Sequence, residues 1–220
     1  MVKIVRFDEF GDASVLKLEE LPLPEPDKGE VRIKVEAIGL NRAEVAFREG
    51  QYIEEPDNFP AILGYEASGV IDAIGEGVTE FKIGDRVSTI PGFSMKKYGV
   101  YGESAIVPVA MVAKYPEKLS PKEGTAIWMQ YITAYGALVE FGQIKSGDFV
   151  LISAASSSVG SAAIQITKAQ GATAIATTRG ESKKQMLLDN GADYVIVTKN
   201  EDLLTRVMEI TNGQGANLIF

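Results

Sequence analysis

The sequence predicts a β-rich domain followed by an α/β domain in a chain of 220 residues. In residues 1–124, short alternating or apolar runs are separated by glycine and proline, which is typical of a compact antiparallel barrel. From Ser120 onward, helix caps alternate with apolar runs, which is typical of a doubly wound parallel sheet. Phe149–Ile152 is an unbroken apolar run, as expected of a strand buried on both faces. We therefore expect domains over residues 1–124 and 125–220.

The first domain is expected to contain one short helix among several strands. Asn41–Arg48 predicts the helix, with Asn41 as N-cap and Glu44 at the capping-box position. Glu30–Ala37 alternates apolar and charged residues, which predicts a half-buried strand. The other expected strands are Lys3–Phe7, Val15–Glu19, Gly69–Gly75, Gly84–Val87, Tyr101–Val107 and Met111–Pro116.

The second domain is expected to alternate helices and strands. The predicted helices are Trp128–Glu140, the helix that Gly171 ends, one capped by Ser182, and Asn200–Thr211. The predicted strands after Phe149–Ile152 are Ala172–Thr178, Tyr194–Val197 and one starting at Ala216. Because a doubly wound sheet needs further strands, we expect the chain to be C-terminally truncated and catalytically weak by itself.

The turn after Phe149–Ile152 has the composition of a nucleotide-binding turn. In a G-x-G-x-x-G register its three positions are Ala155, Ser157 and Gly160, so one glycine of three is present. Gly160 allows close helix packing, and the helix N-terminus suits a pyrophosphate. The predicted cofactor-binding residues here are Ser156, Ser157, Ser158, Val159 and Gly160. The segment alone equally fits a βαβ unit that holds no nucleotide.

Composition excludes several classes of chemistry. The chain has no Cys and no His, so it has no thiol nucleophile, imidazole base or thiolate- or imidazole-bound metal. The net charge of −8 and the lack of a basic cluster argue against nucleic acid as a partner. No apolar run reaches membrane-spanning length and the N-terminus lacks a secretory pattern, so a cytoplasmic protein is expected.

Several sequence blocks occur in one order along residues 1–220. They are Gly39–Asn41 with Arg48–Tyr52, Pro60–Gly69, Val78–Val87, Tyr101–Ser104, Ile132–Leu138 and the opening βαβ unit. In these blocks the chain resembles the medium-chain dehydrogenase/reductases, specifically their zinc-free quinone oxidoreductase branch. The zinc-dependent branch would carry histidine at the position of Tyr65 and cysteine near Ala43. The resemblance therefore implies no metal, a GroES-like barrel, a partial Rossmann domain and a homodimer when full-length.

The resemblance also implies roles for individual residues. Asn41 and Tyr52 would face the nicotinamide and substrate, with Tyr52 as the acid, unless Asn41 is only a helix cap and Tyr52 a wall residue. Thr133 would approach the nicotinamide, unless it is a buried helix hydroxyl bonded to a preceding carbonyl. Tyr65 would shape the vacant metal pocket, and Phe47 would belong to the core or the pocket wall.

The residues after the Ala172–Thr178 strand predict the cofactor. An acidic residue there would bind a ribose hydroxyl and repel a 2′-phosphate. This chain has Thr178, Arg179 and Lys183, which favour a phosphate and hence NADP(H), although Glu181 could bind a ribose in a shifted register.

We therefore expect an NADPH-dependent reductase of small molecules, either quinones or α,β-unsaturated carbonyls. Two alternatives stay open. One is metal-free interconversion of alcohols and carbonyls, which alcohol-driven NADP⁺ reduction would reveal. The other is a nucleotide-binding protein with little turnover, which NADPH binding without oxidation would reveal.

Overall fold

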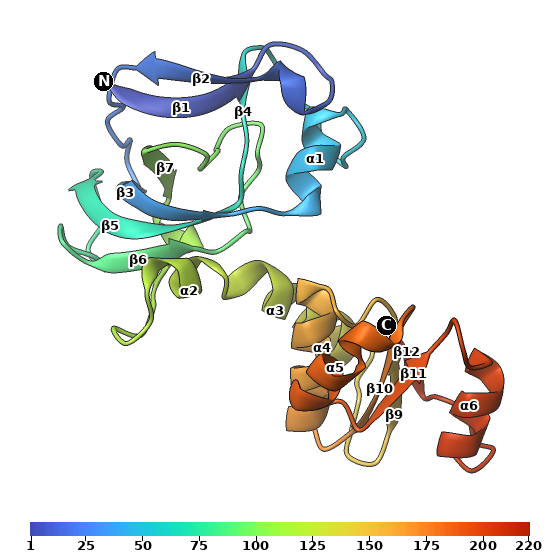
Figure 1. Ribbon diagram of the computed structural model, residues 1–220. Helices are drawn as coiled ribbons and strands as arrows, with labels where there is room; N and C mark the ends of the chain where they lie inside the picture. Colours follow the sequence, from blue (N-terminus) through green and yellow to red (C-terminus); the bar gives the residue numbers. More distant parts are fainter. The chain divides into compact units, whose positions relative to one another are not determined.

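The computed structural model describes all 220 residues and divides into two compact units, Met1–Trp128 and Met129–Phe220 (Figure 1). The first unit contains strands β1 (Val2–Phe7), β2 (Leu16–Leu21), β3 (Glu30–Gly39), β4 (Ala61–Ile62), β5 (Glu66–Ile74), β6 (Arg86–Thr89), β7 (Ser104–Pro108) and β8 (Val112–Lys114). Its helices are α1 (Arg42–Arg48) and α2 (Pro121–Thr125), with short 3₁₀ turns at Ala13–Val15 and Val109–Met111. Helix α3 (Trp128–Tyr135) starts at the last residue of this unit.

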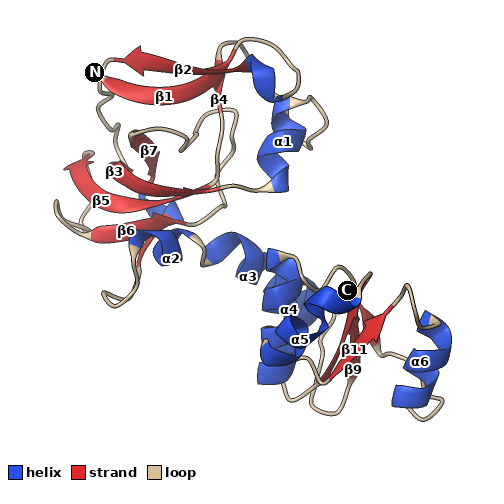
Figure 2. Ribbon diagram, in the orientation of Figure 1, coloured by secondary structure: helices blue, strands red, loops and turns tan.

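Two antiparallel sheets form the first unit (Figure 2). The larger has the strand order β7-β3-β5-β6-β8, and the smaller has the order β2-β1-β4. Backbone bonds join them at β1, where the Val5 N–H donates to Tyr101 O at 2.8 Å and the Glu103 N–H donates to Lys3 O at 2.8 Å. These bonds link β1, the middle strand of the smaller sheet, to the segment before β7. The predicted barrel-like domain is confirmed.

Strand β3 is more deeply buried at its start than the alternating sequence predicts. Glu30 and Arg32 are both 7% exposed, although both belong to the expected solvent face. Arg32 donates to Asp72 Oδ1 at 2.8 Å and to Pro24 O at 2.8 Å, while Glu30 Oε1 accepts from the Tyr98 hydroxyl at 2.7 Å. Hydrogen-bonded partners make burial of these charged groups tolerable.

Helix α2 explains where the first unit ends. Ser120 and Glu123 form the predicted capping box at its start. The Ser68 hydroxyl of β5 donates to Pro121 O at 2.6 Å, and Trp128 Nε1 donates to Ser88 Oγ of β6 at 3.1 Å. These bonds attach residues 121–128 to the barrel, so the first unit extends a few residues beyond the boundary expected at position 124.

The second unit is a parallel sheet with helices on both faces. Its strands β9 (Phe149–Ile152), β10 (Thr173–Thr178), β11 (Tyr194–Val197) and β12 (Leu218–Ile219) lie in the order β11-β10-β9-β12. Helices α4 (Ser158–Ala169) and α5 (Lys184–Asp189) cover one face, and α6 (Leu203–Ile210) covers the other (Figure 1). Val150 and Ile152 point to the α4 side and Leu151 to the α6 side, as the two-residue period of a strand requires. The predicted doubly wound, Rossmann-type sheet is confirmed.

Three details of the second unit differ from the prediction. Helix α3 ends at Tyr135 and continues as a π-helical segment, Gly136–Phe141. Ser182 does not cap a helix, because it lies inside a 3₁₀ turn, Glu181–Lys183, and α5 begins only at Lys184. Ala162, Ile166 and Ala169 recur at helical spacing in α4 and would be expected on one buried face, but Ala162 is buried and Ala169 is exposed. The buried residues of α4 are Gly160, Ala162, Ala163, Ile164 and Thr167.

None of the helices is both long and apolar enough to cross a membrane.

Candidate functional site

The turn between β9 and α4 is built for close approach of the backbone. Ser157 is the N-cap of α4, and its Oγ accepts from the Gly160 N–H at 3.0 Å. The Ser157 hydroxyl therefore still has its own hydrogen to donate. A side chain at Gly160 would place a Cβ 2.7 Å from Ala155 Cα, so only glycine allows α4 to lie this close to the turn. The predicted packing role of Gly160 is confirmed.

Strand order places this turn at the point where the sheet reverses its winding. β9 lies between β10 and β12, so the chain moves to one side of β9 first and to the other side later. Ligands of open α/β sheets bind at the carboxyl ends of the strands at such a reversal. Helix α4 begins at this reversal, and its first N–H groups, at Ser158 and Val159, have no acceptor within the helix.

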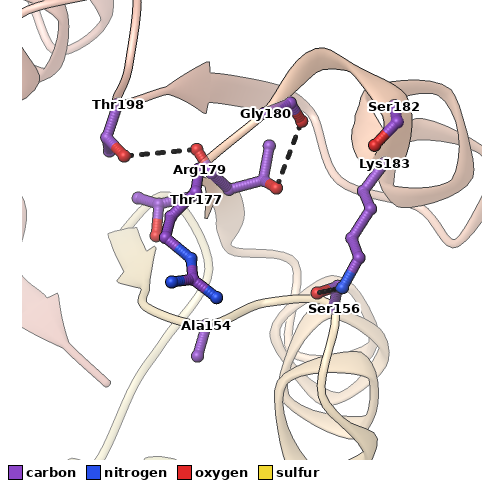
Figure 3. A pocket seen from close by; sticks show the side chains of 9 residues that line it. Ala154, Ser156, Thr177, Arg179, Gly180, Ser182, Lys183 and Thr198 are labelled. Atoms are coloured by element: carbon purple, nitrogen blue, oxygen red, sulfur yellow. Dashed lines mark hydrogen bonds between the residues drawn. The ribbon is translucent and has the colours of Figure 1, made fainter.

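A cavity of about 500 Å³ lies beside the turn, at the carboxyl ends of β9, β10 and β11 (Figure 3). Nine residues line it: Ala154, Ser156, Thr177, Thr178, Arg179, Gly180, Ser182, Lys183 and Thr198. Two of them are cations and none is acidic. The cavity is therefore suited to an anionic group.

The two cations reach the cavity from different places. Arg179 directly follows β10 and is exposed, and Figure 3 shows its guanidinium directed toward Ala154. Lys183 extends from the 3₁₀ turn, and its Nζ donates to Ser156 Oγ at 3.1 Å. Four of the predicted cofactor-binding residues therefore line one cavity, namely Ser156, Thr178, Arg179 and Lys183.

Glu181 does not line this cavity. Its carboxylate accepts from Asn200 Nδ2 at 3.4 Å and lies 3.8 Å from Lys184 Nζ. The residue that could have favoured a ribose hydroxyl is therefore bonded to neighbours outside the cavity.

Thr133 is not part of the cavity. Its hydroxyl donates to the Met129 carbonyl at 2.6 Å, which is the bond expected if Thr133 only caps its own helix backbone and does not approach the nicotinamide. The side chain is exposed, however, and not buried as that alternative assumed. The sequence interpretation missed Thr198, which directly follows β11. Because the carboxyl ends of parallel strands meet at one edge, its position after a predicted strand was the available signal.

The first unit holds the predicted catalytic residues on the loops around α1. Glu44 forms the expected capping interaction, because its Oε2 accepts from the Asn41 N–H at 2.7 Å. The side-chain amide of Asn41 donates, through Nδ2, to Glu66 Oε2 at 3.0 Å. Glu44 Oε1 accepts from the Tyr65 N–H at 3.1 Å. The cap of α1 thus fixes both Asn41 and the backbone of Tyr65.

Tyr52 and Tyr65 form one aromatic cluster with Phe47. The Tyr52 ring packs edge-on against Phe47 and Tyr65, with ring centroids 6.4 Å apart in each pair. The Tyr52 and Tyr65 hydroxyl oxygens lie 3.5 Å apart. Tyr52 is half-buried, whereas Phe47 is completely buried and supports Tyr52 from behind. A direct substrate contact for Phe47 stays a prediction.

Two buried tyrosines in this unit hold their protons strongly. Burial, together with Tyr52 and Glu54, raises the pKa of Tyr65 well above its ordinary value. Burial and the nearby carboxylates of Glu44 and Glu66 likewise raise the pKa of Tyr101. Both phenols therefore stay neutral donors throughout the physiological pH range.

This retention of protons predicts that the protein loses stability in alkaline solution. Above about pH 10 the unfolded chain releases these phenol protons while the folded protein keeps them. The free energy of unfolding should therefore fall as the pH rises, by about 1.4 kcal/mol per pH unit for each such tyrosine. Urea unfolding of the parent and Tyr101→Phe between pH 9 and 11 should show a shallower fall for the variant. Tyr194→Phe, at an exposed position, serves as control, and equal slopes for parent and Tyr101→Phe would contradict the prediction.

No group of three or more acidic, histidine or cysteine side chains is arranged to hold a metal ion. Tyr65, which was predicted to shape a pocket, is 7% exposed. Its hydroxyl faces Tyr52 and Glu54.

Comparison with known proteins places this fold in one family. A family model described as alcohol dehydrogenase GroES-like domain matches residues 27–117, and one described as zinc-binding dehydrogenase matches residues 158–220. The human quinone oxidoreductase is 37% identical over 220 residues, which are 100% of this chain and 65% of that protein.

Two solved structures are similar along almost the whole chain. The Escherichia coli quinone oxidoreductase in complex with NADPH has a TM-score of 0.87 at 30% identity, covering 99% of this chain and 65% of that one. A structure described as an NAD-dependent alcohol dehydrogenase has a TM-score of 0.93 at 34% identity, covering 99% of this chain and 69% of that one.

The two family models together match the barrel unit and the parallel-sheet unit of this chain. The chain belongs to the medium-chain dehydrogenase/reductase superfamily, in its quinone oxidoreductase-like branch. It spans 65% of the length of the human quinone oxidoreductase.

Proposed function

We propose that the protein is an NADPH-dependent reductase of quinones or α,β-unsaturated carbonyl compounds that works without zinc. The observation that carries the proposal is the cavity beside the nucleotide-binding turn, which contains Arg179 and Lys183 but no carboxylate. A 2′-phosphate would be attracted there, whereas an acidic residue would repel it. The E. coli relative described as bound to NADPH supports the same cofactor.

The residues of the second unit fit the parts of this cofactor. The N–H groups of Ser158 and Val159 and the hydroxyl of Ser157 would bind the pyrophosphate at the start of α4. Arg179 offers paired donors to a phosphate, and Lys183 adds a second charge on the opposite wall of the cavity (Figure 3). The cofactor supplies the hydride, and the chain supplies binding and orientation.

The first unit would supply the proton. Tyr52 is half-buried, its ring is held between Phe47 and Tyr65, and its hydroxyl can donate to a substrate oxygen on which negative charge develops. The Asn41 amide, held by Glu66, would help to orient the substrate. No step requires a metal, because a phenol donor takes the place of a Lewis acid at that oxygen.

A second candidate is the interconversion of alcohols and carbonyls. The structural match to an NAD-dependent alcohol dehydrogenase favours it. The absence of His and Cys disfavours it, because zinc or an imidazole relay would normally polarise the carbonyl.

A substrate panel with the full-length protein tests these proposals. NADPH oxidation by quinones and enones, retained after dialysis against a chelator and weaker with NADH, is the expected result. Alcohol-driven reduction of NADP⁺ or NAD⁺ without quinone or enone turnover would support the second candidate. NADPH binding without turnover across the panel would point to a nucleotide-binding protein instead.

A further inference from the structure

The Tyr65 hydroxyl lies between two oxygen acceptors. It is 3.5 Å from the Tyr52 hydroxyl oxygen and 3.3 Å from Glu54 Oε1. The Tyr65 ring itself is fixed, because it is 7% exposed and packs against Phe93 at a centroid distance of 5.5 Å. The hydroxyl can therefore change its acceptor by rotation about its C–O bond without movement of the ring.

Glu54 is held in place as one of these acceptors. The Ser94 hydroxyl donates to Glu54 Oε2 at 2.5 Å, and the Met95 N–H donates to Glu54 Oε1 at 2.8 Å. Both donors come from the segment after β6, whereas Glu54 and Tyr52 come from the loop after α1. The Glu54 carboxylate is thus held by the segment after β6, within hydrogen-bond distance of Tyr65.

We propose that Tyr65 is a positioning residue that acts through Tyr52, donating to Glu54 while Tyr52 is protonated and to the Tyr52 oxygen when that proton moves to the substrate. This inference rests on the proposed function. In the step, the Tyr52 O–H bond breaks and a bond from that hydrogen to the substrate forms. The electron pair stays on the Tyr52 oxygen, which later takes a proton from water.

The surroundings of Tyr65 suit a donor that keeps its own proton. Burial and the neighbouring Tyr52 and Glu54 raise its pKa, so it does not compete with Tyr52 as the acid. Behind it, the backbone N–H is bonded to the Glu44 carboxylate. A hydrogen bond to the charged phenolate is stronger than one between neutral groups, so the contact strengthens as the reaction proceeds.

Removal of the single hydroxyl tests the proposal kinetically in the full-length protein. Tyr65→Phe should lower kcat about 10-fold, the equivalent of one hydrogen bond to a charged group, and leave the substrate KM within about twofold. Tyr98→Phe is the matched control, because Tyr98 belongs to the same run of aromatic contacts but donates its hydroxyl to Glu30 at 2.7 Å. It should leave kcat unchanged.

A double variant separates positioning from a general structural role. If Tyr65 acts through Tyr52, then Tyr52→Phe combined with Tyr65→Phe should be no slower than Tyr52→Phe alone, within about twofold. A full kcat in Tyr65→Phe, or losses that multiply in the double variant, would overturn the proposal. Circular dichroism and thermal unfolding of each variant check the fold.

A readout without turnover keeps this test apart from that of the proposed function. In resting protein labelled with ¹³C at tyrosine Cζ, where Tyr65 is expected to donate to Glu54, Glu54→Gln should shift the Tyr65 resonance, whereas Tyr98→Phe should leave it in place. If the parent turns over no quinone or enone, the proposed function fails, and the resonances still decide the contact. A Tyr65 resonance that stays in place in Glu54→Gln would overturn the inference.

Discussion

A Tyr52→Phe variant is expected to reduce an α,β-unsaturated ketone with a kcat about 100-fold below that of the parent, because a positioned general acid contributes about 10²- to 10⁴-fold. The variant retains the ring and therefore its packing against Phe47 and Tyr65. The hydroxyl that is lost lies 3.5 Å from its nearest partner, Tyr65, so little folding stability depends on it. The KM for NADPH should stay within about twofold of the parent value, since the cofactor phosphates would bind in the second unit.

The choice of substrate sharpens this test. An enolate is a strong base and needs a proton at once, whereas the anion of a hydroquinone is stabilised by its aromatic ring. The loss in Tyr52→Phe should therefore be smaller for a quinone than for an enone. Stopped-flow measurement of NADPH oxidation with both substrates gives the two ratios, and Tyr135→Phe, an exposed tyrosine of the second unit, provides the control. An undiminished kcat with the enone would show that Tyr52 is only a wall residue.

The fold was predictable where its causes are local in the sequence. The capping boxes at Asn41–Glu44 and Ser120–Glu123 depend on residues three positions apart, and both are present. The apolar run Phe149–Ile152 forms β9, as expected of a short strand covered on both faces of a parallel sheet. Tertiary contacts produced the differences. Burial of Arg32 is tolerated because its guanidinium donates to Asp72, which is 40 positions away, and to the carbonyl of Pro24.

The candidate site residues of the second unit were more predictable from the sequence than those of the first unit. Arg179 follows directly on β10, so the rule for the carboxyl ends of parallel strands correctly predicted its place beside the turn between β9 and α4. The contacts of Glu54 were not predictable, because they join residues without regular structure that are 11 and 40 positions away in the sequence. No periodicity or motif indicates such a contact. The positions of side chains at strand ends are therefore predictable from this sequence, whereas contacts between loops are not.

An Arg179→Ala variant is expected to raise the KM for NADPH about 30-fold and to change the KM for NADH by less than about threefold. The difference arises because a guanidinium donates paired, charge-assisted hydrogen bonds to a phosphate and has no such partner in the unphosphorylated cofactor. The magnitude corresponds to about 2 kcal/mol, within the range for hydrogen bonds to charged groups. Steady-state kinetics with both cofactors, or direct titration of nucleotide binding, measures the ratio.

Two companion variants decide whether the cavity itself is responsible. Lys184→Ala removes one positive charge next to Lys183 but outside the cavity, where Lys184 lies 3.8 Å from Glu181. It should leave both KM values nearly unchanged, because a screened charge without direct contact contributes little. Glu181→Gln examines the rival register, in which this carboxylate binds the ribose. Weakened NADH binding in Glu181→Gln, together with an unchanged NADPH KM in Arg179→Ala, would assign the protein to NAD. We expect unchanged NADH binding in Glu181→Gln and a raised NADPH KM in Arg179→Ala, because the cavity contains two cations and no acidic residue.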